Sequence, residues 1–103
     1  MKRRSIIYVP RAGDDLDWIY NTVADASSAL TANRYDRRIR GFCERLDYGS
    51  ERGTLRNDLR PGLRVVGFER RVTVAFMVEP ERVVILRVFY GGVDWENEFG
   101  DED

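Results

Sequence analysis

Arginine is the residue type in this sequence that is best placed to bind a charged ligand or partner. It makes up nearly all the basic residues and clusters in the middle of the chain. Sixteen of the 17 basic residues are Arg, and residues 34–71 hold eleven Arg against six acidic residues. A guanidinium group is permanently charged and donates in a planar fork that matches carboxylates and phosphates. We therefore predict a basic face that binds a target or a partner, formed by Arg56, Arg60, Arg64 and Arg87 with Tyr90.

Three of these arginines also have a purely structural interpretation. Arg60 and Arg64 are close in sequence to Asp58 and Glu69, so they can form ion pairs within the chain. Arg87 lies in an apolar run, where the aliphatic part of its side chain can cover apolar surface while the charge reaches water. A genome rich in G and C, which favours Arg codons, would also raise the Arg content. The sequence leaves these alternatives open.

The residue types on which most catalytic sites depend are absent or isolated. The chain has no His, which excludes His-based acid–base catalysis and His metal ligands. Cys43 is the sole Cys and falls on an apolar helical stripe, where a thiol behaves as a small hydrophobic group. The acidic run Asp14–Asp17 suits a helix start better than a calcium loop. We predict no catalytic residue, no metal site and no cofactor.

Length and charge indicate one small domain with an acidic end. The 103 residues fit a single domain, and the net charge of −1 conceals a basic middle and six acidic residues among the last thirteen. We expect a domain over 1–96 and an acidic tail over 97–103. The acidic segment Asp94–Asp103 is either a disordered solubilising end or a segment that folds over the basic middle. The single Cys and the lack of any apolar run of ~20 residues favour a cytoplasmic protein without a membrane span.

Two helices are predicted in the first half of the chain. A strand at Ser5–Val9 ends at Pro10, residues 11–13 form a turn, and Asp14 and Asp15 begin the first helix. Thr31 caps the second helix, which stops at Tyr48–Ser50. Apolar residues recur at helical spacing in both: Leu16, Ile19, Tyr20, Val23 and Ala26 in the first, and Tyr35, Ile39, Phe42, Cys43 and Leu46 in the second. The two helices should form an antiparallel hairpin.

Three strands are predicted in the second half, at Leu63–Phe68, Val72–Val78 and Val83–Tyr90. The links between them are too short for a parallel crossover, so they form an antiparallel meander. The last strand is apolar on nearly both faces, as expected of a central strand. The fold class is therefore α+β in the order β-α-α-β-β-β, with a helical hairpin packed on a mostly antiparallel four-stranded sheet.

The order and spacing of these features resemble the ParE/RelE toxin superfamily of type II toxin–antitoxin modules, also called plasmid stabilisation proteins. The resemblance covers residues 5–96. It rests on the helical hairpin, the meander and several short motifs, which are Asp17-x-x-Tyr20, Cys43-Glu44, Arg52-Gly53, Asp58-Leu59-Arg60-Pro61-Gly62-Leu63-Arg64 and Arg87-Val88-Phe89-Tyr90.

The superfamily resemblance implies one of two functions. RelE-like members cleave mRNA in the ribosome with basic side chains and a C-terminal Tyr or similar group, and ParE-like members mostly poison DNA gyrase. The positions of that ribonuclease set fall at Thr73, Val93 and Phe99, which offer no strong donors for phosphate charge. We therefore expect the ParE branch: a non-enzymatic inhibitor of DNA gyrase, without direct sequence-specific binding to nucleic acid.

The same resemblance implies a cognate antitoxin that neutralises the toxin in a hetero-oligomer, through a segment that folds on its surface. Two alternatives remain open. One is a ribosome-dependent mRNA endonuclease, in which Arg64, Arg71, Arg87 and Tyr90 converge on phosphate. The other is an inactive copy that only binds its antitoxin.

Overall fold

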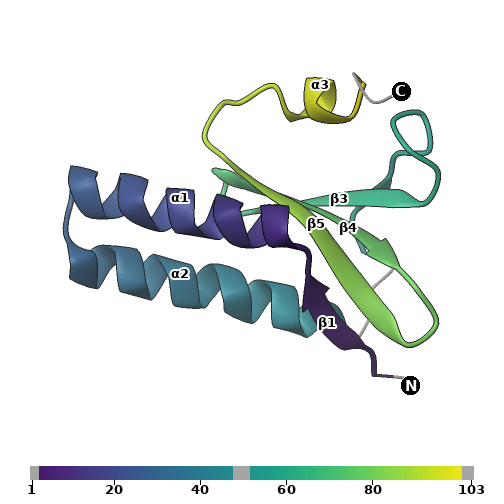
Figure 1. Ribbon diagram of the computed structural model, residues 1–103, viewed down its shortest axis with the longest axis horizontal. Coiled ribbons are helices and arrows are strands. Elements are labelled where there is room, and N and C mark those ends of the chain that lie inside the picture. The colour runs from purple at the N-terminus through teal and green to yellow at the C-terminus, as the bar shows by residue number, and fades with distance from the viewer. Residues whose placement is uncertain (1–2, 48–51, 101–103) are drawn as a thin grey trace.

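The computed structural model describes residues 3–47 and 52–100, and these form the predicted α+β fold (Figure 1). The elements are β1 (Ser5–Tyr8), α1 (Pro10–Ala26), α2 (Ala29–Glu44), the 3₁₀ turn η1 (Arg45–Asp47), β2 (Thr54–Leu55), β3 (Leu63–Phe68), β4 (Val72–Val78), β5 (Arg82–Tyr90) and α3 (Trp95–Gly100). The long helices α1 and α2 form the expected hairpin. The predicted stop of the second helix at Tyr48–Ser50 lies outside the described residues.

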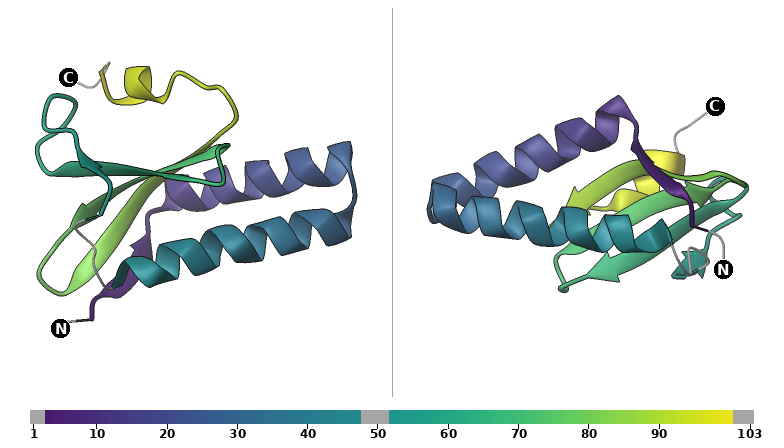
Figure 2. Two further views of the ribbon diagram at one scale, coloured as in Figure 1. Left: turned by 180° about the vertical axis from the view of Figure 1, so that it is seen from behind. Right: turned by 90° about the horizontal axis from the view of Figure 1, so that it is seen from below.

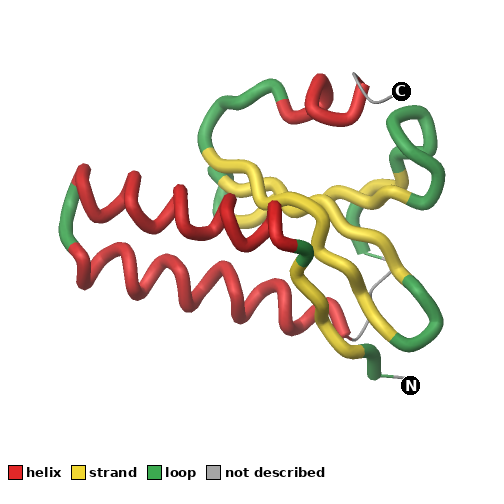
Figure 3. Tube along the Cα trace, viewed as in Figure 1, coloured by secondary structure: helices red, strands yellow, loops and turns green. Residues whose placement is uncertain are grey.

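The sheet has five strands in the order β1-β5-β4-β3-β2, rather than the four predicted (Figure 3). The meander β3-β4-β5 is antiparallel as expected, β1 pairs in parallel with β5, and β5 lies inside the sheet. The additional strand β2 has only two residues, Thr54 and Leu55, which pair with Val65 and Arg64 of β3. Two residues inside a polar connector are too few to produce a period-2 pattern, so the sequence carries no sign of this strand.

Helix α1 begins four residues earlier than predicted. Pro10 occupies its first turn, where the fixed φ of proline suits a helix and its missing N–H is not needed. The N–H groups of Ala12 and Gly13 donate to the carbonyl of Val9. The predicted turn at residues 11–13 is therefore wrong, and so is the assignment of Asp14 and Asp15 to the helix start.

Helix α2 is capped by Ser28 rather than by the predicted Thr31. The side-chain oxygen of Ser28 accepts a hydrogen bond from the Thr31 N–H at 3.1 Å. Thr31 is thus the third residue of the helix, at the position that donates to such a cap. Within residues 3–47 and 52–100, the helices are too short or too polar to span a membrane.

The two faces of the sheet carry two separate apolar clusters, and Figure 2 shows the long helices on one side of the sheet and α3 on the other. The larger cluster lies between the sheet and the α1–α2 hairpin, and its buried members include Leu16, Ile39, Cys43, Val74, Phe76 and Ile85. The smaller cluster lies on the opposite face, beneath α3, and consists of Leu63, Val65, Ala75, Phe89 and Phe99. Side chains alternate along β4, since Val74 and Phe76 face the helices and Ala75 faces away.

A substitution at Gly13 tests the early start of α1. A Cβ atom at Gly13 would have no neighbour within 4 Å, and Ala is more favourable than Gly inside a helix by about 0.5–1 kcal/mol. We expect Gly13→Ala to raise the free energy of unfolding in urea by about that amount.

Gly53→Ala is the contrasting control for this test. Gly53 has φ +78°, and a Cβ atom there would clash with the backbone carbonyl oxygen of Val65. We expect this change to lower the free energy of unfolding by about 1–3 kcal/mol. A loss of stability in Gly13→Ala as well would contradict the helical start at Pro10.

Candidate functional site

Arg87 on β5 is bound by two carboxylates from two other elements. Asp15 of α1 accepts hydrogen bonds from Nε at 2.8 Å and from Nη2 at 3.0 Å, and Glu98 of α3 accepts one from Nη1 at 2.9 Å. The side chains of Arg87 and Asp15 are each 15% exposed. The hydrogen bond to Asp15 raises the pKa of Arg87 against the opposing effect of burial, and the bond to Glu98 adds to the rise. Arg87 is therefore a charged residue held at the junction of three elements.

Asp15 occupies this place because β5 is longer than β1. Strand β1 ends at Tyr8, opposite Ile85, whereas β5 continues to Tyr90. Past Ile85 this side of β5 faces α1, and the backbone N–H of Val88 donates to Asp15 Oδ2 at 2.8 Å. One carboxylate thus satisfies a backbone donor at the end of the β1 pairing and also neutralises Arg87.

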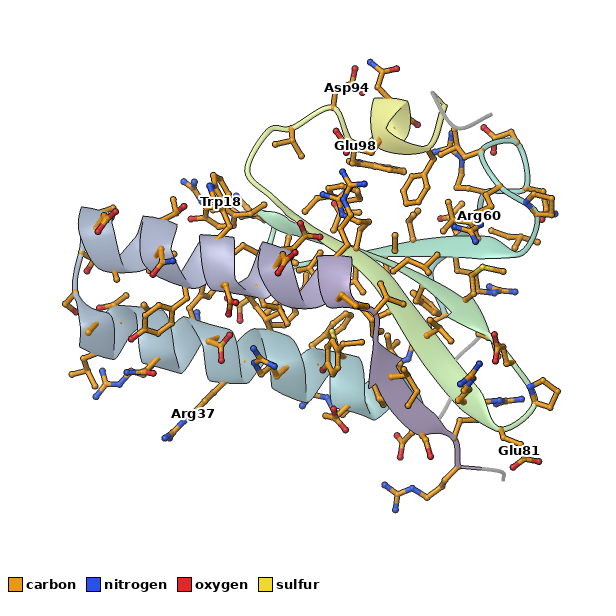
Figure 4. All side chains as sticks on the ribbon, viewed as in Figure 1. Trp18, Arg37, Arg60, Glu81, Asp94 and Glu98 are labelled. Atoms are coloured by element: carbon orange, nitrogen blue, oxygen red, sulfur yellow. The ribbon has the colours of Figure 1, made fainter. Side chains whose placement is uncertain are left out.

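Arg60 and Arg87 meet at a small cleft beside α3. The cleft holds about 160 Å³, and its lining includes Arg11, Arg60, Arg87, Glu98 and Phe99. Glu98 Oε1 contacts Arg87 Nη1 at 2.9 Å and Arg11 Nη2 at 3.4 Å. Figure 4 shows Arg60 at the opposite end of the sheet from the helical hairpin, and Glu98 on the side of α3 toward α1. Two guanidinium groups, those of Arg87 and Arg11, therefore contact one carboxylate of the acidic end, and Arg60 lines the same cleft.

Arg56 is neutralised by a separate pair of carboxylates. Its Nε and Nη2 donate to both oxygens of Asp58 at 2.9 and 2.8 Å, and its Nη1 donates to Glu96 of α3 at 2.7 Å. These hydrogen bonds, the one to Asp58 first, raise the pKa of Arg56, and the same contact lowers the pKa of Asp58. The guanidinium carbon also lies 5.5 Å from the centre of the Trp95 ring, within cation–π distance.

Arg64 and Tyr90 lie apart from that cleft. Arg64 lines a wide, open depression of about 570 Å³ together with Arg4 and Glu79. Tyr90 packs edge-on against Trp18 at 6.3 Å and Tyr35 at 5.9 Å, measured between ring centres. It also borders a cleft of about 200 Å³ that includes Arg87 and Trp18.

The five predicted residues therefore do not form one continuous site. In the β4 pairing, Arg64 stands opposite Phe76 and Arg87 stands opposite Ala75. Phe76 and Ala75 belong to the apolar clusters on opposite faces of the sheet. Arg64 and Arg87 thus leave the sheet on different faces, and the convergence on phosphate that a ribonuclease would need is not formed by this pair.

Sequence reasoning misses the carboxylates that hold the arginines. It assigns Asp15 to a helix start, and it does not name the arginines that Glu96 and Glu98 contact. The available signal is Arg87 itself, because an arginine inside an apolar strand needs a partner when its charge is buried. The sequence alone cannot choose among the eighteen acidic residues of the chain.

Cys43 lies in the larger apolar cluster and is fully buried. Burial raises the pKa of its thiol to about 11, so the thiolate that acts as nucleophile or metal ligand is scarce at neutral pH. In the described part of the chain, no group of three acidic, Cys or His side chains is placed to hold a metal ion.

Comparison with known proteins assigns the family. A family profile described as the ParE toxin of the type II toxin–antitoxin system parDE matches residues 6–95. The chain belongs to the ParE toxin family. The expectation of the ParE branch, drawn from the resemblance to the superfamily, is thus confirmed, and the chain is a ParE-like toxin of a type II toxin–antitoxin system.

Two relatives agree with this assignment. Toxin ParE3 of Caulobacter vibrioides is 31% identical over 86 residues, which cover 84% of this chain and 85% of ParE3. A solved structure, the chromosomal ParDE TA system from P. aeruginosa, has a TM-score of 0.75 at 24% identity and covers 86% of this chain and 97% of that chain. At that identity the structural match supports the fold.

The burial of Cys43 predicts a slow thiol reaction. We expect iodoacetamide at pH 8 to alkylate the native chain about 100-fold more slowly than the chain unfolded in urea, since the raised pKa removes thiolate and packing excludes the reagent. Mass spectrometry of timed samples measures both rates. Comparable rates in the native and unfolded chains would contradict this prediction, because they would show that the Cys43 thiol is accessible and could act as a nucleophile.

Proposed function

We propose that this ParE-family chain inhibits DNA gyrase and that a cognate antitoxin neutralises it by binding its surface. The observation that carries the proposal is the family match over residues 6–95, which covers both helices of the hairpin and all five strands. Characterised ParE-like toxins mostly act on gyrase, so family membership favours this target over the ribosome.

The environment of Phe99 supports a non-enzymatic mode of action. Phe99 falls where the ribonuclease branch carries its C-terminal Tyr or similar group. In this chain its ring is 6% exposed and packs edge-on against Phe89 at 6.0 Å. A buried phenyl ring cannot donate a proton or a hydrogen bond to a scissile phosphate. Inhibition by binding is therefore the mode that this end of the chain favours.

Arg60 and Arg64 are the residues that we propose as target contacts. Both border the connector that leads from β2 to β3. Hydrogen bonds give this connector a defined shape, from the Gly62 N–H to Asn57 Oδ1 at 2.8 Å and from the Leu63 N–H to the Arg60 carbonyl at 3.0 Å. Arg56 and Arg87, which carboxylates neutralise, and Tyr90, which packs against Trp18 and Tyr35, would then have structural roles instead of contacting the target.

The proposed partner is an antitoxin, in keeping with the toxin–antitoxin family. One solved structure similar to this chain is that of a chromosomal ParDE TA system. Exposed apolar side chains offer such a partner additional contact area, and they include Trp18 on α1, Leu30 on α2 and Leu55 on β2.

A supercoiling assay tests the target and the two proposed arginine contacts together. We expect the purified chain to inhibit gyrase or to trap cleaved DNA in the presence of ATP. The double change Arg60→Ala and Arg64→Ala should raise the half-inhibitory concentration about tenfold or more, because each charged contact is worth about 1.5–3 kcal/mol.

Arg37→Ala is the matched control, because Arg37 lies on α2 and points away from the body of the molecule (Figure 4). It should leave the inhibition unchanged. Absence of any effect on gyrase, together with cleavage of mRNA in a ribosome assay, would contradict the proposed target. Equal inhibition by the double variant would refute the assignment of these two arginines.

A further inference from the structure

The sheet face opposite the α1–α2 hairpin is an apolar surface that the chain covers with its own last helix. Leu63, Val65, Ala75 and Phe89 form this face, which we name the second face. The ring of Phe99 packs edge-on against Phe89, and the ring of Trp95 stacks on Phe89 with 6.3 Å between ring centres. Figures 1 and 2 show α3 on this side of the sheet, away from the two long helices.

The rim of the second face is basic, and α3 matches it with acidic residues. Glu96 accepts a hydrogen bond from Arg56, and Glu98 accepts hydrogen bonds from Arg87 and Arg11. The helix thus presents two aromatic residues four positions apart, which lie on one side of a helix, and two carboxylates that meet the arginines. Helix α3 therefore shows which groups bind to this surface: aromatic rings at its centre and carboxylates at its rim.

Helix α3 is attached only weakly to the second face. The helix has six residues, which is far below the ~12–15 residues at which isolated helices become marginally stable. The side chains of Glu96 and Glu98 are 51% and 41% exposed in their ion pairs with arginine. Ion pairs this exposed add little to the stability of the fold and are screened by salt.

A glycine pair joins α3 to the rest of the molecule. Gly91 has φ +79°, and a Cβ atom at either Gly91 or Gly92 would have no neighbour within 4 Å. This joint can change its backbone angles without steric cost, so that α3 can leave the second face while β5 stays in the sheet.

We propose that the second face is an exchange site, which α3 occupies until an acidic amphipathic helix of a protein partner replaces it. The partner helix carries aromatic side chains that cover Phe89 and carboxylates that pair with Arg56 and Arg87. A protein fits this surface better than nucleic acid, because phosphates would pair with the arginines and leave the apolar centre uncovered. The inference rests on the proposed function only for the identity of the partner as the antitoxin.

The probe that tests the exchange is the chain's own end, supplied as a fluorescein-labelled peptide with the sequence of residues 93–103. Its binding to the full-length chain is measured by fluorescence anisotropy. In the chain, the double change Glu98→Gln and Phe99→Ala weakens the internal helix and leaves the second face intact. We expect this variant to bind the peptide about tenfold more tightly than the unmodified chain does.

Two controls make this binding specific. Asp25→Asn removes an exposed carboxylate at the far end of α1 and should leave the peptide affinity of the chain unchanged. A peptide with the same Glu98→Gln and Phe99→Ala changes should lose about tenfold in affinity for the double variant. Equal binding by the variant and the unmodified chain, or equal binding of both peptides, would overturn the proposal.

Displacement is also measurable with α3 unmodified. In a Trp18→Phe chain, Trp95 is the only fluorescent indole. A saturating peptide that has Phe in place of Trp95 should raise the acrylamide quenching of Trp95 about twofold as α3 leaves the surface. Unchanged quenching at saturation, or displacement by a short DNA duplex but not by the peptide, would refute the exchange. None of these readouts involves gyrase, so their failure is distinct from failure of the proposed target.

Discussion

Arg87 lies where a helix, a strand and the last helix of the chain meet, and its ion pair with Asp15 holds this junction together. Two hydrogen bonds of 2.8 and 3.0 Å fix the guanidinium group to α1, and the same carboxylate accepts the Val88 N–H. A bidentate pair of this kind is strong and directional. It is also costly to break, because a single largely buried charge would remain. The position of α1 along β5 and the site to which α3 returns both depend on this contact.

Other arginines also form ion pairs that connect separate elements of the fold. Arg38 joins α2 to the turn after β3 through both oxygens of Glu69, and Arg3 joins the start of the chain to Asp47 of η1. The basic middle of the sequence is therefore in part a set of intramolecular pairs that connect helices to strands. Arginine content alone is a poor guide to a binding surface for this reason.

The fold was largely predictable because its elements obey simple periodicities. Apolar residues alternate along β4 and recur at helical spacing along α1 and α2. These positions belong to the larger apolar cluster, which includes Leu16 and Phe76. Two features were not predictable from local pattern. The residues before Asp14 read as a turn because Pro10 and Gly13 are common in turns, yet proline also suits the first turn of a helix. Strand β2 exists only through its pairing with β3.

The site was less predictable than the fold, because ion pairs between distant residues leave no periodic trace. Asp15 and Arg87 are 72 positions apart, and Arg56 and Glu96 are 40 apart. The acidic end had two interpretations, and the described residues of α3 carry the contacts of the second, in which it folds over arginines. Only the three-dimensional arrangement pairs each arginine with its carboxylate.

A double-mutant cycle on Asp15 and Arg87 tests the central contact most directly. Unfolding in urea would be measured for the unmodified chain, Asp15→Asn, Arg87→Met and the double variant. If the pair holds the junction, the coupling free energy should be about 1.5–3 kcal/mol. The double variant should then lose less free energy of unfolding than the sum of the losses in the two single variants. Losses that add to within about 0.5 kcal/mol would show that the two residues act independently, and would contradict the account.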